Sequence, residues 1–272
     1  MRAYTRQMTP LQPMSRKQAR TLGRAPRITV VGVLGELFIT AGVLVLLFLG
    51  WQVWLNDIIV GAQQQEAGEE LAQEWERPPV APQPNETGDV EPSEPVGIDD
   101  PMVLAAPANN AKFANLIVPR LGVDYRRPIT QGVGYNVLND SKAGIGHYPE
   151  TQMPGDFGNF ALAAHRTTYG RSFHNVNELV VGDSMYVETE LGWYRYVYRN
   201  TEYVRPTGVG VLNPVPQTQG VDANERFITL TSCNPYFSKA ERIISYGVFD
   251  AYFPREGGAP LEIAELVQAT GA

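Results

Sequence analysis

The chain contains a single cysteine, Cys233, in the segment RFITLTSCNP that spans residues 226–235. One cysteine can form no disulfide within the chain, and it cannot build a structural zinc site. The apolar and β-branched residues 227–231 predict a buried strand, and Pro235 marks a loop behind it. The thiol is therefore expected where a strand meets a loop, which suits a nucleophile. The alternative is a small buried hydrophobic side chain, a common setting for free cysteine.

A nucleophilic thiol needs a proton acceptor and donor, and the chain has three histidines, His147, His165 and His174. His165 follows the apolar run 160–164 and precedes a polar loop, so it has the same predicted setting as Cys233, at the tip of a strand. His147 lies in the glycine-rich segment GIGHYP and His174 in a short helical turn. For both of these we favour structural hydrogen bonding. His165 is therefore the predicted general acid and base.

A positive charge is expected near the thiol as well. Arg242 begins the apolar run 243–248, which would lie antiparallel to the cysteine strand if residues 234–241 form a hairpin loop. That arrangement returns Arg242 to the neighbourhood of Cys233, where a fixed cation would stabilise a developing oxyanion. The alternative is an ordinary ion pair at the end of a strand.

These side chains must be positioned by a domain that we place at residues 101–256. Short runs of period two, separated by Gly, Pro and Asn, predict a mainly β domain, either a sandwich or a closed barrel. The expected strands are 113–118, 160–164, 184–189, 193–204, 227–232 and 242–253, and the expected helical segments are 137–143 and 173–179.

The rest of the chain divides by charge. Residues 1–27 carry seven bases and no acid, and we assign them to a cytoplasmic arm. Residues 28–55 predict a transmembrane helix, interrupted only by Glu36 and followed by Trp51 and Trp54 at the opposite interface. Residues 66–100 carry eleven acids against one base, and prolines follow Glu76, so 56–100 is predicted to be an extended, disordered linker. Residues 257–272 form either a short amphipathic helix against the domain or a tail.

Several segments in order resemble the sortase family, with most similarity to the class E sortases of actinobacteria. They are IVPRLG at 117–122, GHYP at 146–149, FGN at 157–159, AHR at 164–166, VVGD at 180–183, TLTSC at 229–233 and the following Arg242. The chain departs from the family at Ser232, where Thr is usual, at Asn234, where class E commonly has His, and at Ala164, where Gly is frequent. The resemblance implies an eight-stranded β-barrel and a membrane-anchored cysteine transpeptidase.

For this chain the resemblance implies that Cys233 attacks the Thr carbonyl of an LPxTG-like or LAxTG-like sorting signal and forms a thioester. His165 would protonate the leaving amine, and Arg242 would stabilise the oxyanion. Four further residues are predicted to bind substrate: His147, Thr231, Ser232 and Asn234. The partners would be secreted proteins bearing a C-terminal sorting signal and an amino group of a peptidoglycan precursor of the lipid II type, at the outer face of the plasma membrane.

Three alternatives stay open. A pilin-polymerising sortase would use a different amine, and a noncatalytic membrane-tethered β domain would serve as an interaction module. A papain-like peptidase also uses Cys and His but places Cys first, whereas here His165 precedes Cys233 by 68 positions. We expect no cofactor and no required metal, and the acidic balance outside the N-terminal arm opposes nucleic-acid binding.

Overall fold

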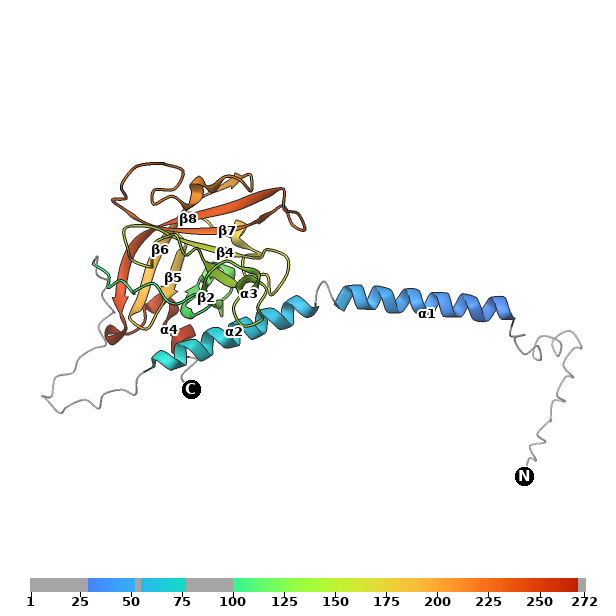
Figure 1. Cartoon of the computed structure of the whole chain (residues 1–272). Helices are drawn as coiled ribbons and strands as arrows, with labels where there is room; N and C mark the ends of the chain where they lie inside the picture. Colours follow the sequence, from blue (N-terminus) through green and yellow to red (C-terminus); the bar gives the residue numbers. More distant parts are fainter. Residues whose placement is uncertain (1–28, 52–54, 77–99, 269–272) are drawn as a thin grey trace, which may run out of the picture. The chain divides into compact units, whose positions relative to one another are not determined.

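The computed structural model describes residues 29–51, 55–76 and 100–268 (Figure 1). The predicted arm at 1–27, Trp54 and most of the proline-rich part of the linker lie outside the described residues. The chain forms two compact units, residues 1–49 and 50–272, and each is described by itself.

The first unit contains one long helix, α1, at Val30–Gly50. It has 21 residues and a mean hydropathy of 2.4, and none of its side chains is buried. At 1.5 Å per residue the helix is about 32 Å long, close to the ~30 Å hydrocarbon thickness of a bilayer. By length and composition, α1 can therefore cross a membrane, within the segment predicted to do so.

The second unit is built on a closed barrel of eight strands, in the order β1-β2-β3-β4-β7-β8-β6-β5. This confirms the mainly β fold and selects the barrel over the sandwich. The strands are β1 Lys112–Ile117, β2 Arg126–Gln131, β3 Ile145–His147, β4 Gly158–Ala164, β5 Ser184–Glu188, β6 Gly192–Val204, β7 Arg226–Asn234 and β8 Glu241–Pro254. The helices are α2 Asn56–Trp75, α3 Tyr135–Leu138 and α4 Leu261–Gln268, with 3-10 turns η2 Pro119–Leu121, η3 Val176–Glu178, η4 Val209–Leu212 and η5 Arg255–Gly257.

Alternate residues of the strands fill the barrel. In β4 these are Phe160, Leu162 and Ala164, and in β7 they are Ile228 and Leu230, all in one apolar core. Because side chains alternate across a strand, the intervening residues of both strands lie on the outer face. Two pairings are parallel, β2 with β3 and β4 with β7, and the remaining pairings are antiparallel. The parallel pair β4–β7 brings the ends of two distant strands to the same edge of the barrel.

Two strands, β2 and β3, were absent from the sequence prediction. β2 carries Arg126, Arg127 and Pro128, so its residues show no apolar alternation, and β3 has only three residues. The helical segment expected at 173–179 is reduced to the 3-10 turn η3. These strands are recognisable only by their pairing, which a local pattern does not contain.

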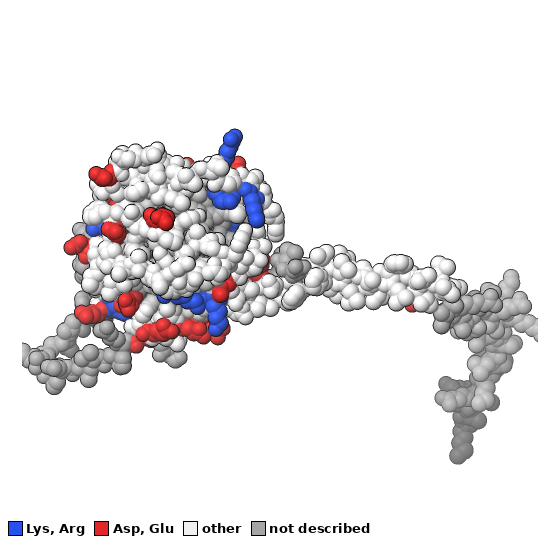
Figure 2. Space-filling model, in the orientation of Figure 1, with Lys and Arg blue, Asp and Glu red and all other residues white. Residues whose placement is uncertain are grey.

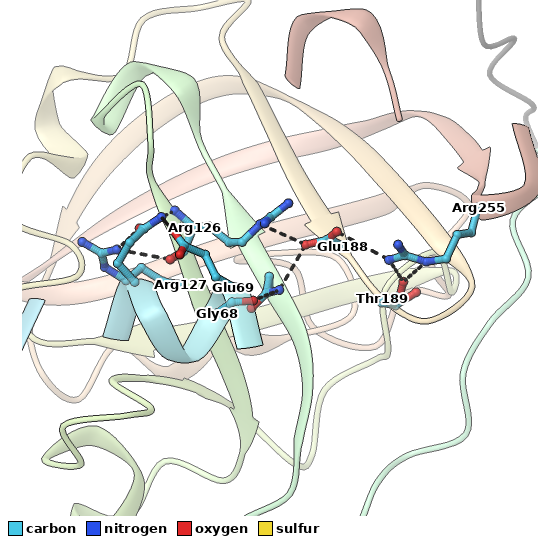
Figure 3. A network of polar contacts seen from close by, with 9 residues as sticks. Gly68, Glu69, Arg126, Arg127, Glu188, Thr189 and Arg255 are labelled. Carbon is cyan, nitrogen blue, oxygen red and sulfur yellow. Dashed lines mark hydrogen bonds and ion pairs between the residues drawn. The ribbon is translucent and has the colours of Figure 1, made fainter. Parts of the chain in front are cut away.

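The prediction of an extended linker is wrong for residues 56–75, which form α2 and pack on β1 and β2 (Figures 1 and 3). The face that α2 buries includes Gly61, Gln64, Gly68 and Leu71. A Cβ on Gly68 would lie 3.1 Å from the carbonyl oxygen of Arg126, so glycine permits this close approach. Small and polar residues make up most of this face, and hydrophobic periodicity therefore gave no sign of it. The helix does end at Trp75, three residues before the first of the prolines, Pro78.

A buried polar network joins α2 to the barrel (Figure 3). Asn115 of β1 donates through Nδ2 to the carbonyl oxygen of Gly68 at 2.9 Å and to Glu188 Oε2 at 3.0 Å. Glu188 also pairs with Arg126 at 3.2 Å and with Arg255 at 3.5 Å. Glu188 and Arg126 are fully buried, so each charge depends on the other for compensation.

The C-terminal segment contains the helix α4, so the helix is the correct one of the two expectations for 257–272. Ile263 is buried in a second apolar cluster with Tyr186, Trp193 and Phe253. The Tyr186 hydroxyl donates to Glu262 Oε2 at 2.7 Å, which adds a polar contact to the packing.

Candidate active site

Three strand ends bring the predicted catalytic residues together. Cys233 near the end of β7 lies directly opposite Arg242 at the start of β8. Residues directly opposite on antiparallel strands have Cβ atoms about 5 Å apart. His165 follows β4, whose parallel pairing with β7 runs to Ala163 opposite Thr231. Two residues beyond that pair stand His165, directly after the end of β4, and Cys233, still within β7, so the imidazole and the thiol lie at neighbouring strand ends.

The three side chains also belong to the same face of the sheet. Cys233 alternates with the inward-facing Leu230 and Ser232 positions, His165 with Ala164, and Arg242 with Ile243. All three are half-buried, so each is reachable from solvent. The Ser232 hydroxyl donates to the carbonyl oxygen of Ala164 at 2.8 Å and ties β7 to β4 beside the site.

The imidazole of His165 is held on two sides. Its Nε2 lies 2.8 Å from Asn139 Oδ1, and its ring lies 5.1 Å from that of Tyr169. Burial lowers the pKa of His165 below its ordinary value of 6.5, the positive charge of Lys239 lowers it further, and the carboxylate of Asp57 opposes both. The neutral ring is therefore favoured near neutral pH.

Arg242 is oriented by backbone carbonyls. Its NH1 group donates to the carbonyl oxygens of Glu241 at 2.9 Å and Lys239 at 3.2 Å. Within the described ranges, no carboxylate lies in ion-pair distance of Arg242, so the ion-pair alternative has no partner there.

The residues predicted to bind substrate occupy different settings. Thr231 lies on the outer face, where the hydroxyl of Tyr148 is 3.1 Å from its Oγ1. Thr231 also donates to the carbonyl oxygen of Leu162 at 3.0 Å, and Ser232 donates to that of Ala164, so both residues are buried and bonded to β4. Of the two hydroxyls, that of Thr231 is on the same face as the thiol.

Asn234 lies in a network that fixes the β7–β8 loop. Its Oδ1 accepts from Arg166, and its Nδ2 donates to Glu241 Oε2 at 3.0 Å. Arg166 also donates to Asn177 Oδ1 at 2.8 Å, and its guanidinium lies 4.2 Å from the ring centroid of Tyr236. Both ends of the Asn234 amide are thus occupied by protein groups.

His147 is not at the surface of the site. It is buried, and its ring stacks on Phe160 with centroids 4.9 Å apart. Nδ1 lies 2.7 Å from Gln131 Oε1, and Nε2 lies 3.0 Å from the carbonyl oxygen of Gln152. Burial lowers the pKa of His147 to about 4. His174 is likewise engaged, with Nδ1 2.8 Å from the carbonyl oxygen of Arg166. Both have the structural hydrogen bonds that we favoured for them.

Sequence reasoning missed Asn139, Tyr148 and Arg166 as neighbours of the site. Asn139 follows a four-residue helix and is brought to His165 by a loop, so no spacing in the chain indicates the contact. Tyr148 and Arg166 stood inside segments already noted, GHYP and AHR, which were the available signal. Across the described ranges, no three His, Cys, Asp or Glu side chains gather as metal ligands.

A closed barrel that presents a thiol, an imidazole and a guanidinium on one outer face defines a candidate cysteine acyl-transfer enzyme. The profile described as "Sortase domain" matches residues 116–250. Sortase SrtE1 of Streptomyces coelicolor is 35% identical over 264 residues, which cover 93% of this chain and 68% of that protein.

Solved structures agree. The SrtA sortase from Actinomyces oris matches with a TM-score of 0.57 and 36% identity, over 60% of this chain and 93% of that one. The Sortase E1 structure from Streptomyces coelicolor, solved with a tripeptide in the active site, matches with a TM-score of 0.52 and 36% identity, over 57% and 99% of the two chains. The chain belongs to the sortase family of cysteine transpeptidases, and class E sortases are among its relatives.

Proposed function

We propose that Cys233, His165 and Arg242 carry the transpeptidation and that the acyl donor is a sorting signal of the LPxTG or LAxTG type, cleaved between Thr and Gly. The observation that supports this most is the register of β7, which sets Cys233 opposite Arg242 and beside the end of β4. The noncatalytic interaction module is disfavoured by membership of a transpeptidase family.

In the first half-reaction the Cys233 thiolate attacks the carbonyl carbon of the Thr residue. The carbonyl π electrons move to oxygen, and Arg242 stabilises this oxyanion. When the intermediate collapses, the C–N bond to Gly breaks, and His165 gives its proton to the departing amine nitrogen. The products are a thioester on Cys233, a free glycine amine and a neutral imidazole.

In the second half-reaction an amine attacks the thioester. Its nitrogen gives a proton to His165, the C–S bond breaks, and the new amide leaves with Cys233 restored as the thiolate. The acceptor that we propose is the amino group of a peptidoglycan precursor. A lysine side chain of a pilin would indicate the polymerising alternative instead, and an assay with each amine in turn separates the two.

Substrate contact is proposed for Thr231 because it shares the outer face with the thiol, although it is buried and its hydroxyl already bonds to the carbonyl oxygen of Leu162. A supporting role is proposed for the other three residues. His147 stacks on Phe160 of the core, Ser232 bonds to Ala164, and both ends of the Asn234 amide bond to protein groups. A tripeptide occupies the active site of the related Sortase E1, which supports a peptide donor here.

The proposed location is the plasma membrane, with α1 as its single span, the N-terminus in the cytoplasm and the barrel outside. The length and hydropathy of α1 support the span. The seven bases before it support the orientation, because positively charged flanks are retained in the cytoplasm.

The test compares the wild type with Cys233→Ala, His165→Ala and Arg242→Ala on LPxTG and LAxTG peptides, with mass spectrometry of the protein. We expect a thioester adduct on Cys233 in the wild type. Cleavage should fall by at least about 10³-fold without the thiol, and by about 10²–10³-fold without the guanidinium. Arg199→Ala, at an exposed position of β6, is the matched control for Arg242→Ala. Wild-type cleavage by both Cys233→Ala and His165→Ala would end the proposal.

A further inference from the structure

The helix α2 places an amide side chain inside the catalytic domain. Gln64 is fully buried, although it belongs to a segment of the chain that reads as a polar linker. Its Nε2 donates to the carbonyl oxygens of Tyr169 at 3.0 Å and Asp140 at 3.2 Å. Its Oε1 accepts from the Ser172 hydroxyl at 2.9 Å. One side chain thus satisfies three polar groups on two separate loops.

Two glycines shape the slot that Gln64 enters. A Cβ on Gly144 would lie 2.3 Å from Gln64 Nε2, and a Cβ on Gly170 would lie 2.5 Å from Oε1. Both glycines have positive φ, 88° and 82°, where a side chain would strain the backbone. The slot therefore requires glycine on each wall for two independent reasons.

The same two loops hold the imidazole of His165. The loop that runs from Asn139 to Gly144 supplies the amide oxygen at 2.8 Å from Nε2. The loop that follows His165 supplies Tyr169, whose ring lies beside the imidazole. Gln64 bonds to the residue after Asn139 and to Tyr169 itself. Gln64 therefore contacts one of the two residues that touch the imidazole directly, and the other through the adjacent Asp140.

We propose that Gln64 of α2 is a positioning residue for His165, acting through Asn139 and Tyr169. This inference rests on the proposed role of His165 as the general acid and base. Because the Asn139 oxygen can only accept, it holds the hydrogen of His165 on Nε2 and leaves Nδ1 to exchange the catalytic proton. Catalysis is sensitive to misplacement of a reacting group by about 1 Å, so loosened loops would slow the chemical step.

The experiment uses the full chain in detergent and compares Gln64→Met with the wild type. Methionine keeps the length of the side chain but makes none of the three hydrogen bonds. Gln63→Met, at the neighbouring exposed position, is the matched control. The measurements are kcat and KM on the sorting-signal peptide cleaved fastest by the wild type, the thermal unfolding midpoint, and the pKa of His165 from NMR of labelled histidine.

We expect kcat of Gln64→Met to fall about tenfold, with KM within twofold of wild type. The pKa of His165 should rise towards 6.5, because looser loops admit water and burial is the largest cause of its depression. Two charged groups act on this ring: Lys239 on the β7–β8 loop lowers its pKa, and Asp57 on α2 raises it. A folded Gln64→Met with unchanged kcat and unchanged His165 pKa would overturn the proposal.

A second pair of variants decides the matter if Gln64→Met does not fold. Asn139→Ala removes the contact to Nε2 without touching α2, and kcat should fall. Asn139→Asp retains an oxygen acceptor, so kcat should recover while the acidic limb of the rate profile moves to higher pH. Wild-type kcat in Asn139→Ala would overturn the link. If His165→Ala proved fully active, the proposed function would fail, whereas the NMR pKa of His165 would still report on Gln64.

Discussion

At the scale of the residue, the protonation of His165 is influenced by groups that lie outside the proposed catalytic set. Burial and Lys239 both lower its pKa, and Asp57 raises it. A transfer that starts from thiolate and imidazolium therefore has only a small fraction of the active ion pair near neutral pH. The side chain of Lys239 contributes only its charge to the proposed chemistry, and a substitution keeps the backbone carbonyl that Arg242 binds, so Lys239 is a suitable site for a test.

Lys239→Gln removes the charge and should raise the pKa of His165. The protonated ring then persists to higher pH, so the acidic limb of kcat/KM should move to higher pH and the maximum should increase. The measurement is kcat/KM across pH at constant ionic strength. Lys142→Gln is the control for loss of an exposed charge. An acidic limb that stays in place would show that Lys239 does not act on His165.

The buried setting of His147 predicts an effect on stability. Its pKa is about 4 in the folded protein, against 6.5 for the ordinary side chain. Between these two pH values His147 is protonated in the unfolded chain but neutral in the folded protein. The free energy of unfolding therefore decreases as the pH falls from 6.5 to 4. The loss amounts to about 3 kcal/mol.

His147→Phe retains a ring against Phe160 and has no group to protonate. Its unfolding free energy should be lower than that of wild type at neutral pH, because Gln131 and Gln152 lose a partner. The difference should shrink by about 3 kcal/mol on going to pH 4. Urea unfolding at a series of pH values measures this, and parallel pH curves for the two proteins would contradict it.

At the scale of the element, strands with period two were predictable, and elements held by polar or backbone contacts were not. The runs 160–164 and 227–232 gave β4 and β7, and with them the positions of His165 and Cys233. β2 begins with two arginines and a proline, and its charge is compensated by Glu188, which is 62 residues further along the chain than Arg126. The docking of α2 depends on Gln64 and two glycines, and Asn139 reaches His165 through a loop. Such contacts exist only once the fold has formed, so local patterns cannot reveal them.

The polar network in Figure 3 predicts that Glu188 makes a large contribution to the free energy of unfolding. Glu188→Gln keeps the shape of the side chain but leaves Arg126 buried without its counter-charge. We expect the free energy of unfolding to fall by about 3–5 kcal/mol. Denaturant unfolding measures the change, with the exposed Glu190→Gln as the control, which should stay within about 0.5 kcal/mol of wild type. A Glu188→Gln variant as stable as that control would show that the buried pair contributes little.

At the scale of the whole molecule, the helices α1 and α2 differ sharply in charge. A row of acidic residues lies along the exposed side of α2, including Glu66, Glu70 and Glu74 (Figure 2). α1 carries Glu36 as its one charged residue. The acidic surface of α2 opposes binding to nucleic acid, and the apolar composition of α1 suits a membrane.

The proposed orientation predicts the result of protease treatment of intact cells. With the barrel outside, external protease should remove it and leave a protected fragment that contains α1 and the residues before it. Replacing the seven bases of residues 1–27 with Gln should reduce the fraction in this orientation. Immunoblotting with tags at each end measures both effects. Protection of the barrel in intact cells would contradict the orientation.

The parallel pairing of β4 with β7 also bears on how the protein folds. Residues 166–225, which contain β5 and β6, separate β4 from β7 in the sequence. This long segment must form a closed loop before the two strands can pair. Pairings so far apart in sequence raise contact order and slow folding. No short fragment of the chain holds both the thiol and the imidazole in place. With these two groups in their proposed roles, transpeptidation begins only when the barrel closes, and the recovery of activity during refolding measures when that happens.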